Sequence, residues 1–529
     1  MAVAALAAAS TLLSACGSDD DEPASGASAG AGRAGGTLTF AVGSDAGCVD
    51  PQQGGSNDTV YSLRQIVDSL TDQNPQTGEI VPWLAERWEI SPDAKTFTFH
   101  LRPGATFSDG TPVNARSVKD NFDAIPKLGT LAVLGQGYLS GYEGTTVVDD
   151  LTAAVAFKQA NAQFLQATST FSLGLVSGAS VAKTPQQRCR DGVVGSGSFA
   201  LSKYVPNQSI TLVKRKDYNW GSSLWAKKGE AYLDTLVFKV VPEAGVRTAS
   251  LASGQVDAIG SVSRSDESAL KGGGVNLQAR ANPGVVFSLG LNNSRPILQD
   301  EKVRQAILFA IDRRQVVDTV FPTGTQPATS ILAHTTPSYQ DLSSGVLFDA
   351  ARARSLLDSA GWTPGGDRIR QKDGTPLRLT VDWFTNAATN KSTLELIQQQ
   401  LKAVGIDIVL KEQQIAQVVQ IQRSGDFDAL WGNLTRADPD ILRSQYSTQL
   451  ANAYRLPPTQ LDTVLADQAA EPDPAKRQSL VAQAQQLIVQ NAYVVPVVEL
   501  QTELGVSKNV HNLDFEASSR IQLHDTWKS

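Results

Sequence analysis

The residues that most often carry catalysis are scattered along this 529-residue chain. None of the four histidines stands in a His-Glu-x-x-His arrangement or at another metal-binding spacing. No Gly-x-Ser-x-Gly sequence lies between a predicted strand and a predicted helix, where a nucleophilic serine would be exposed. The sequence therefore predicts a protein that is not an enzyme and that holds no metal or other cofactor. The four histidines are His100, His334, His511 and His524.

Cys16 has the surroundings of a processing site. An apolar stretch and two small residues precede it, and an acidic run follows. This arrangement resembles the bacterial lipobox, in which the cysteine becomes the mature N-terminus and carries a lipid. We therefore expect residues 1–16 to be a signal peptide and Cys16 to anchor the protein to the outer face of the cytoplasmic membrane. The alternative is a plain secretory signal with an incidental cysteine. No Lys or Arg precedes Arg33, so the usual basic segment is missing.

The remaining cysteines are Cys48 and Cys189, an even pair. In an oxidising compartment outside the cytoplasm, such a pair predicts one disulfide. The spacing does not show that the two Cα atoms come within bridging range, so two buried thiols are the alternative.

The composition is that of an ordinary globular protein, with 41% hydrophobic and 19% charged residues. A net charge of -7 provides no basic face for phosphate, which argues against nucleic acid as a partner. A chain of this length exceeds the size at which a single core stops growing, so at least two lobes are expected. Residues 17–36, rich in Gly, Ala, Ser and acids, predict a flexible linker. No second apolar run approaches the roughly 20 residues that span a bilayer.

Hydrophobic periodicity predicts elements of both kinds in the first half of the chain. A strand over 37–42 ends at a loop of turn-forming residues, and apolar residues at helical spacing predict a helix over 62–70. Asn114 is placed to cap a helix that begins at Ala115. Further strands are predicted over 96–101, 209–213 and 236–241.

The second half repeats the order strand, helix, glycine, strand. Leu394, Ile397, Leu401 and Val404 form one helical stripe that ends at Gly405. This order is typical of α/β units, in which a helix covers one face of a sheet. The sequence therefore predicts two α/β lobes. The other elements predicted here are a helix capped by Asp300, a helix through 316–320, a helix over 350–360, and strands over 377–383 and 406–410.

Several short blocks stand in a characteristic order along residues 36–505: 82–88, 97–113, 195–199, 216–220, 253–257, 292–296 and 303–313. In that order they resemble the family 5 extracellular solute-binding proteins of ABC importers, which include oligopeptide, dipeptide, nickel and haem carriers. Each block is weak by itself, but their order along the chain makes chance similarity implausible.

The resemblance implies a periplasmic-binding-protein-like α/β fold of two lobes (class II, cluster C) with a subdomain inserted in lobe I. Lobe I comprises 37–60, 195–285 and 498–529, the inserted subdomain 61–194, and lobe II 286–497. It also implies a monomeric lipoprotein that binds a small polar ligand, first of all an oligopeptide, between its lobes. The further partners are the permease subunits of an ABC importer and the membrane, reached through the lipid anchor.

Two alternatives stay open. One is a carrier of a non-peptide ligand, such as a metal chelate, haem, an opine or a sugar-like compound. The chain has one Met and four His, which makes direct capture of a metal ion unattractive. The other alternative is a signalling receptor that presents its ligand to a sensor.

Binding residues are expected in loops at strand ends, where a rigid scaffold can place them in a cleft. The resemblance of 428–440 to a family loop implies that Asp438 holds the ligand's ammonium group. The alternative is that Asp438 caps the turn before Pro439, and Arg436 could either neutralise Asp438 or meet an anionic ligand. The aromatic candidates could equally pack within their own lobe. The full set is Gly43, Ser44, Asp45, Trp383, Phe384, Asn386, Trp431, Asn433, Arg436 and Asp438.

Overall fold

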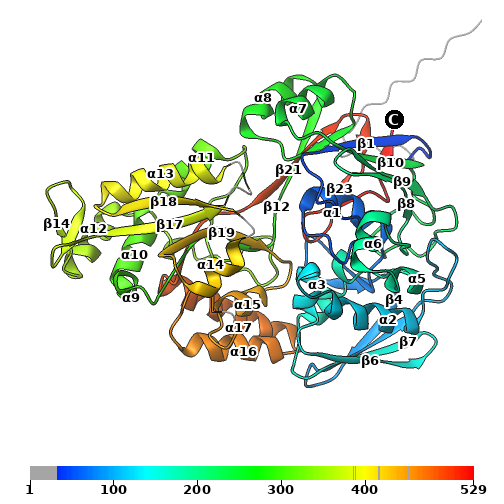
Figure 1. The fold of residues 1–529 in the computed structure, drawn as a ribbon, viewed down its shortest axis with the longest axis horizontal. Coiled ribbons are helices and arrows are strands. Elements are labelled where there is room, and N and C mark those ends of the chain that lie inside the picture. Colours follow the sequence, from blue (N-terminus) through cyan, green and yellow to red (C-terminus); the bar gives the residue numbers. More distant parts are fainter. Residues whose placement is uncertain (1–31, 385–386, 388, 415–416, 451) are drawn as a thin grey trace, which may run out of the picture. The chain divides into compact units, whose positions relative to one another are not determined.

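A computed structural model describes residues 32–384, 387, 389–414, 417–450 and 452–529 (Figure 1). Cys16, Asn386 and the predicted segments 1–16 and most of 17–36 therefore lie outside the described residues. Among the helices that the structure describes, none is both long and apolar enough to cross a bilayer.

A seven-stranded mixed sheet organises the N-terminal and C-terminal parts of the chain. Its central strand β1 pairs in parallel with β10 and β11. Leu38, Phe40 and Val42 of β1 point into one hydrophobic cluster, and Ala41 lies in another, so the strand is covered on both faces. The strands in spatial order are β12 (Val275–Ala281), β21 (Gln501–Ser507), β11 (Ala258–Gly260), β1 (Thr37–Val42), β10 (Thr235–Val240), β9 (Ser209–Lys214) and β8 (Phe199–Val205).

A five-stranded mixed sheet organises the second large part. Leu379, Val381 and Trp383 alternate along β17 and pack into its hydrophobic cluster. Helix α13 packs on β18 next to it. The strands in spatial order are β18 (Asp407–Gln413), β17 (Arg378–Phe384), β19 (Ala429–Thr435), β13 (Gly284–Leu291) and β20 (Val494–Val498).

The chain passes between these two sheets through two short crossings, which we define as 282–283 and 499–500. Asn282 N donates to Leu500 O at 2.7 Å, so the two crossings are hydrogen-bonded to each other. Figure 1 shows β12 and β21, which lead into them, side by side. The first crossing lies about two residues earlier than the predicted boundary. Pro283 cannot donate to a ladder, so β13 begins directly after it, at Gly284, which adopts φ 112°.

A third cluster belongs to the inserted part and its four-stranded antiparallel sheet, in the order β4 (Ala85–Ile90), β5 (Thr96–Leu101), β7 (Thr152–Phe157) and β6 (Tyr142–Asp149). The remaining small sheets are β14 (Thr363–Pro364), β15 (Arg370–Lys372) and β16 (Thr375–Pro376); β2 (Thr71–Gln73) and β3 (Ile80–Pro82); β22 (Val510–His511) and β25 (Trp527–Lys528); and β23 (Asp514–Phe515) and β24 (Ile521–Gln522).

The predicted helix over 62–70 is wrong in its second half. The structure has α1 (Asn57–Leu63) and a 3-10 turn, and Val67 is already extended, with φ -130° and ψ 145°. Leu63, Ile66 and Val67 pack with the seven-stranded sheet, whereas Leu70 packs in the inserted part. Helical spacing arose here because one segment serves two cores. The hydrophobic clusters thus divide this segment between Val67 and Leu70.

Other predicted helices form with the expected ends. Asn114 makes a capping box with Ser117, and Asp300 accepts from Lys302 N. Gly405 takes φ 92° just after α13, a conformation that suits glycine. The helices not yet bounded are η1 (Arg64–Ile66), α2 (Ala115–Ala124), η2 (Ile125–Leu131), α3 (Val133–Tyr138), α4 (Phe164–Ala167), η3 (Phe171–Leu173), α5 (Gly178–Val181), α6 (Pro185–Asp191), α7 (Ala244–Ala252), α8 (Arg264–Gly272), α9 (Pro296–Gln299), α10 (Glu301–Ala310), α11 (Arg313–Val320), η4 (Ser343–Gly345), α12 (Ala350–Ser359), α13 (Asn390–Ala403), α14 (Val418–Ser424), α15 (Ile441–Tyr446), α16 (Gln460–Ala470) and α17 (Pro474–Gln490).

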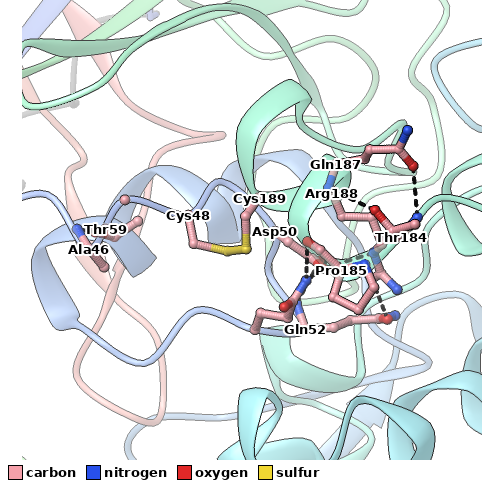
Figure 2. Close-up of a disulfide and its surroundings, with 12 residues drawn as sticks. Ala46, Cys48, Asp50, Gln52, Thr59, Thr184, Pro185, Gln187, Arg188 and Cys189 are labelled. Atoms are coloured by element: carbon pink, nitrogen blue, oxygen red, sulfur yellow. Dashed lines mark hydrogen bonds and ion pairs between the residues drawn. A yellow bond between two sulfur atoms is a disulfide. The ribbon is translucent and has the colours of Figure 1, made fainter.

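A disulfide joins Cys48, in the loop after β1, to Cys189 of α6, 141 residues further along the chain (Figure 2). Beside it, Arg188 Nε and Asp50 Oδ2 form a fully buried ion pair at 2.8 Å. Gln52 accepts a further hydrogen bond from Arg188. The covalent link and the ion pair together fix α6 to the loop after β1.

Replacing both cysteines by serine should lower the free energy of unfolding by about 2–5 kcal/mol, because the disulfide removes the closure entropy of a long loop from the unfolded chain. Urea unfolding of the variant and of wild-type protein, each with and without reductant, measures this. The reductant should destabilise only the wild-type protein. Equal stability of oxidised wild type and variant would show that the disulfide contributes nothing.

Candidate functional site

A cavity of about 800 Å³ is lined by residues from both large sheets and from both crossings. We call it the central cavity. The residues from the seven-stranded side and the crossings are Asn57, Tyr61, Ser261, Val262, Ser263, Arg264, Ser265, Asn282, Leu500, Gln501, Thr502 and Glu503. The residues from the five-stranded side are Phe287, Thr319, Val320, Phe321, Pro322, Thr325, Ala387, Thr389 and Asn433.

Most polar groups in this lining are uncharged hydroxyls and amides, and they alternate with apolar and aromatic surface. Such a lining can exchange hydrogen bonds with a polar solute and shield it from water. In the described part of the chain, no group of three or more His, Cys, Asp or Glu side chains could hold a metal ion. The arrangement is suited to holding a polar molecule.

The rim of the central cavity is bridged by α8 and the loop after α11. Arg264 Nη1 donates to Phe321 O at 2.8 Å. Thr323 N donates to Glu267 Oε1 at 2.5 Å. Both bonds join a charged side chain on one side of the cavity to a backbone atom on the other, and such charge-assisted bonds are among the stronger ones.

Glu503 is the carboxylate in the central cavity lining, and it is buried. Its Oε2 has no hydrogen-bond partner among the described residues. Burial, followed by the charge of Glu267, raises the pKa of this carboxyl to about 7, and the charge of Lys271 acts against this rise. The charge of the cavity therefore changes near neutral pH.

Among the predicted binding residues, Asn433 lines the central cavity. Trp431, two residues earlier on β19, is buried and stacks on Phe287 with ring centroids 5.3 Å apart. Its indole N–H donates to Asn390 Oδ1 at 2.9 Å, and the Asn390 amide donates to Phe384 O at 2.8 Å. Trp431 thus supports the cavity wall from behind, through Phe287.

Trp383 and Phe384 are buried at the end of β17, and neither lines the central cavity. Trp383 packs in the core of the five-stranded sheet. Packing within its own lobe, the alternative interpretation from the sequence, describes Trp383 in this structure.

The loop Gly43, Ser44 and Asp45 also lies away from the central cavity lining. Ser44 donates to Asp58 at 2.9 Å. Asp45 accepts from the Tyr204 hydroxyl at 2.7 Å and from Asn207 N at 2.9 Å. These bonds hold the loop after β1 against the β8–β9 turn, which is a structural role.

Asp438 is buried, with 3% of its surface exposed, and both of its carboxylate oxygens are engaged. Arg477 donates to them at 2.9 and 2.6 Å, and Asp440 N donates to Oδ1 at 2.7 Å. The structure therefore favours the alternative that Asp438 fixes its own turn. Arg436 makes no ion pair with Asp438, and its guanidinium lies over the Tyr138 ring.

Sequence reasoning missed most of the lining, including Tyr61, Ser263, Thr389 and Glu503. Only Glu503 carried a usable signal, since it is the one acidic residue in the strand Gln501–Ser507. The other residues belong to segments far apart in sequence, which the two crossings bring together.

Two α/β sheets, joined by two adjacent crossings and sharing a polar cavity, define a two-lobe binding protein. The model of the bacterial extracellular solute-binding proteins, family 5 (middle), matches residues 79–455. This chain belongs to that family.

Two relatives and one solved structure illustrate the likeness. The nickel-binding periplasmic protein of Escherichia coli K12 is 25% identical over 370 residues, 67% of this chain and 68% of that protein. The periplasmic murein peptide-binding protein MppA of the same organism is 25% identical over 485 residues, 85% of each chain. The crystal structure of NikA from Brucella suis in complex with Fe(III)-EDTA has a TM-score of 0.81 at 24% identity, covering 93% of this chain and all of that one. The last comparison confirms the predicted fold.

Replacing Asp438 by alanine should cost about 3–5 kcal/mol of stability, because it leaves the Arg477 guanidinium buried without its partner. Urea unfolding measures this loss. Asp426→Ala is the matched control, since Asp426 is 86% exposed and its ion pair with Arg295 lies at the surface. If the Asp438→Ala variant had wild-type stability and weakened ligand binding, the result would support the prediction that Asp438 binds the ligand.

Glu503→Gln should raise the melting temperature at pH 8 and have little effect at pH 5. The folded pKa of Glu503 lies above the ordinary value of 4.5, so ionisation destabilises the folded state increasingly as pH rises from about 4.5 through 7. Calorimetry of both proteins between pH 5 and 8 measures the difference. Exposed Glu89 provides the control, Glu89→Gln, and a pH-independent difference at Glu503 would contradict the assignment.

Proposed function

We propose that this protein is the solute-binding lipoprotein of an ABC importer, which captures an oligopeptide between two lobes and delivers it to the permease. The observation that carries the proposal is the central cavity, lined from both sheets and both crossings in a member of family 5. A solute in this cavity touches both sides at once.

The crossings make this arrangement usable for transport. A ligand that contacts both lobes stabilises the closed form by its extra contacts there, and an importer can distinguish the closed from the open form. Asn282 belongs to the joint itself: its backbone N–H bonds to Leu500, and its side-chain oxygen accepts from Thr502 at 2.7 Å. Asn282 and Thr502 both line the cavity, so ligand and joint share residues.

The chemistry of the lining supports a peptide. Side-chain amides and hydroxyls can satisfy main-chain N–H and C=O groups, while bridging waters accommodate different side chains. The murein peptide-binding relative, aligned over 85% of this chain, supports the same class. The nickel-binding relative keeps a metal-chelate carrier as the second candidate.

The location and the partners follow from the sequence. Lipidation of Cys16 would hold the protein at the outer face of the cytoplasmic membrane, and residues 17–36 would give it reach toward the permease. The family description, extracellular solute binding, agrees with this placement. We propose that the protein acts as a monomer.

Native mass spectrometry of gently purified protein should show a heterogeneous set of bound peptide masses. Asn433→Ala should weaken binding of that set about tenfold or more, because it removes a polar contact from the cavity wall. Asn276→Ala, at an exposed position on β12, is the control and should retain the ligands. A single discrete non-peptide mass would defeat the peptide assignment and favour the chelate carrier.

A further inference from the structure

Two arginines face a second, narrow cavity of about 10 Å³. Arg436 directly follows β19, and Arg520 directly precedes β24. The inserted part closes the cavity with Tyr138 and with the segment 170–172. We call this place the arginine cavity. Arg436 is 9% exposed and Arg520 is 8% exposed, so both cations are taken out of water.

Arg436 has no acidic partner among the described residues. Its guanidinium carbon lies 4.8 Å from the centre of the Tyr138 ring, and its Nη2 lies against Gly137. Its Nε is buried and has no hydrogen-bond partner within the described part of the chain. A cation–π contact of this kind offsets only part of the cost of burying a charge.

The guanidinium of Arg520 also makes few hydrogen bonds. One guanidinium nitrogen donates to Ser518 O at 3.0 Å, and the guanidinium carbon lies 5.8 Å from the Phe171 ring centre. Its Nε is also buried, and no described residue accepts a hydrogen bond from it. In the part of the chain that the structure describes, neither arginine forms an ion pair, whereas Arg477 nearby is paired on both sides of its fork.

The neighbouring acids are already in use. Asp438 is held by Arg477 and by Asp440 N. Glu516 accepts from the Ser518 hydroxyl and from Arg520 N. Asp440 is paired with Arg443, so among the described residues neither Arg436 nor Arg520 has a carboxylate as ion-pair partner. A buried charge is costly unless it is paired and hydrogen-bonded, so this arrangement points to a missing anion.

The arginine cavity and the central cavity are close enough to serve one ligand. Asn433 lines the central cavity and Arg436 the arginine cavity. Three residues of extended chain span about 10 Å, roughly the length of a tripeptide. Burial raises the pKa of Tyr61, which lines the central cavity, and the charge of Arg520 acts against this rise, so Arg520 lies within electrostatic reach of both cavities.

We propose that Arg436 and Arg520 bind a carboxylate of the transported solute, so that the protein selects acidic ligands or ligands with a free carboxyl terminus. This rests on the proposed function of solute binding. In the present arrangement the arginine cavity has space for about one water. Its walls come from three separate segments, and the carboxylate would enter when they part and be enclosed when they meet.

The proposal is tested by isothermal titration of the purified full chain with three probes: trialanine, trialanine amide, and the amide of Ala-Glu-Ala. Trialanine should bind at least about tenfold more tightly than its amide, as expected for the loss of charge-assisted hydrogen bonds. Ala-Glu-Ala amide separates the two carboxylate sources, because it binds well only if a side-chain carboxylate can replace the terminal one.

The variants are Arg436→Gln and Arg520→Gln, with Arg378→Gln as the control because Arg378 is an exposed arginine paired with Asp407. Both test variants should bind acid and amide alike, whereas the control should keep the preference. Without ligand, Arg436→Gln should melt at or above the wild-type temperature, since it removes an unpaired buried cation. A lower melting temperature combined with an intact acid preference would overturn the proposal and make Arg436 structural.

The measurements distinguish failure of the proposed solute binding from failure of the proposed carboxylate site. Equal binding of trialanine and its amide to wild-type protein would contradict the carboxylate site but not the proposed solute binding. If no peptide binds, the peptide class fails, and a titration with citrate decides the carboxylate site. A citrate-dependent rise in melting temperature that both variants lose supports the site, and its absence in wild-type protein overturns it.

Discussion

The arrangement of the binding site depends on the place where the chain runs between its two large sheets. Both crossings are two residues long, and they are hydrogen-bonded to each other through Asn282 and Leu500. Pro283 and Gly284 fix where the first crossing ends, and a side chain at Gly284 would collide with the backbone of Leu434 and Arg436. The same few residues therefore define the joint, start β13 and set the position of Arg436. Because Asn282 and Leu500 line the central cavity, a solute there would contact the two links between the sheets.

Local patterns in the sequence predicted much of the fold because one or two interactions decide each element. The strand at 37–42 and the helix capped by Asn114 depend on alternation and on a side-chain cap, both of which are visible in a few consecutive residues. The segment 62–70 failed for the opposite reason. Its apolar residues are divided between two hydrophobic clusters, and nothing in their spacing shows that division.

The candidate site was harder to predict than the fold. Trp431 was predicted as an aromatic wall and Asp438 by its position in the family loop, yet each contacts a partner far away in sequence, Phe287 and Arg477. Asn433, unlike Trp431 and Asp438, lines the central cavity. Whether a polar group is free for a ligand depends on what else is near it, and this information arises only when distant segments meet. Arg436 illustrates the same rule in reverse, since an acid two residues away does not pair with it.

The bonds across the rim of the central cavity have a consequence for how such a protein can evolve. Arg264 donates to the main-chain oxygen of Phe321, and Glu267 accepts from the main-chain N–H of Thr323 as well as from its side chain. Phe321 and Thr325 line the central cavity, and their side chains do not form the bonds across its rim. Substitutions at these positions can therefore reshape the pocket while the two sides still meet through the same atoms. After gene duplication, a few substitutions could therefore change the ligand while the bonds across the rim stay the same.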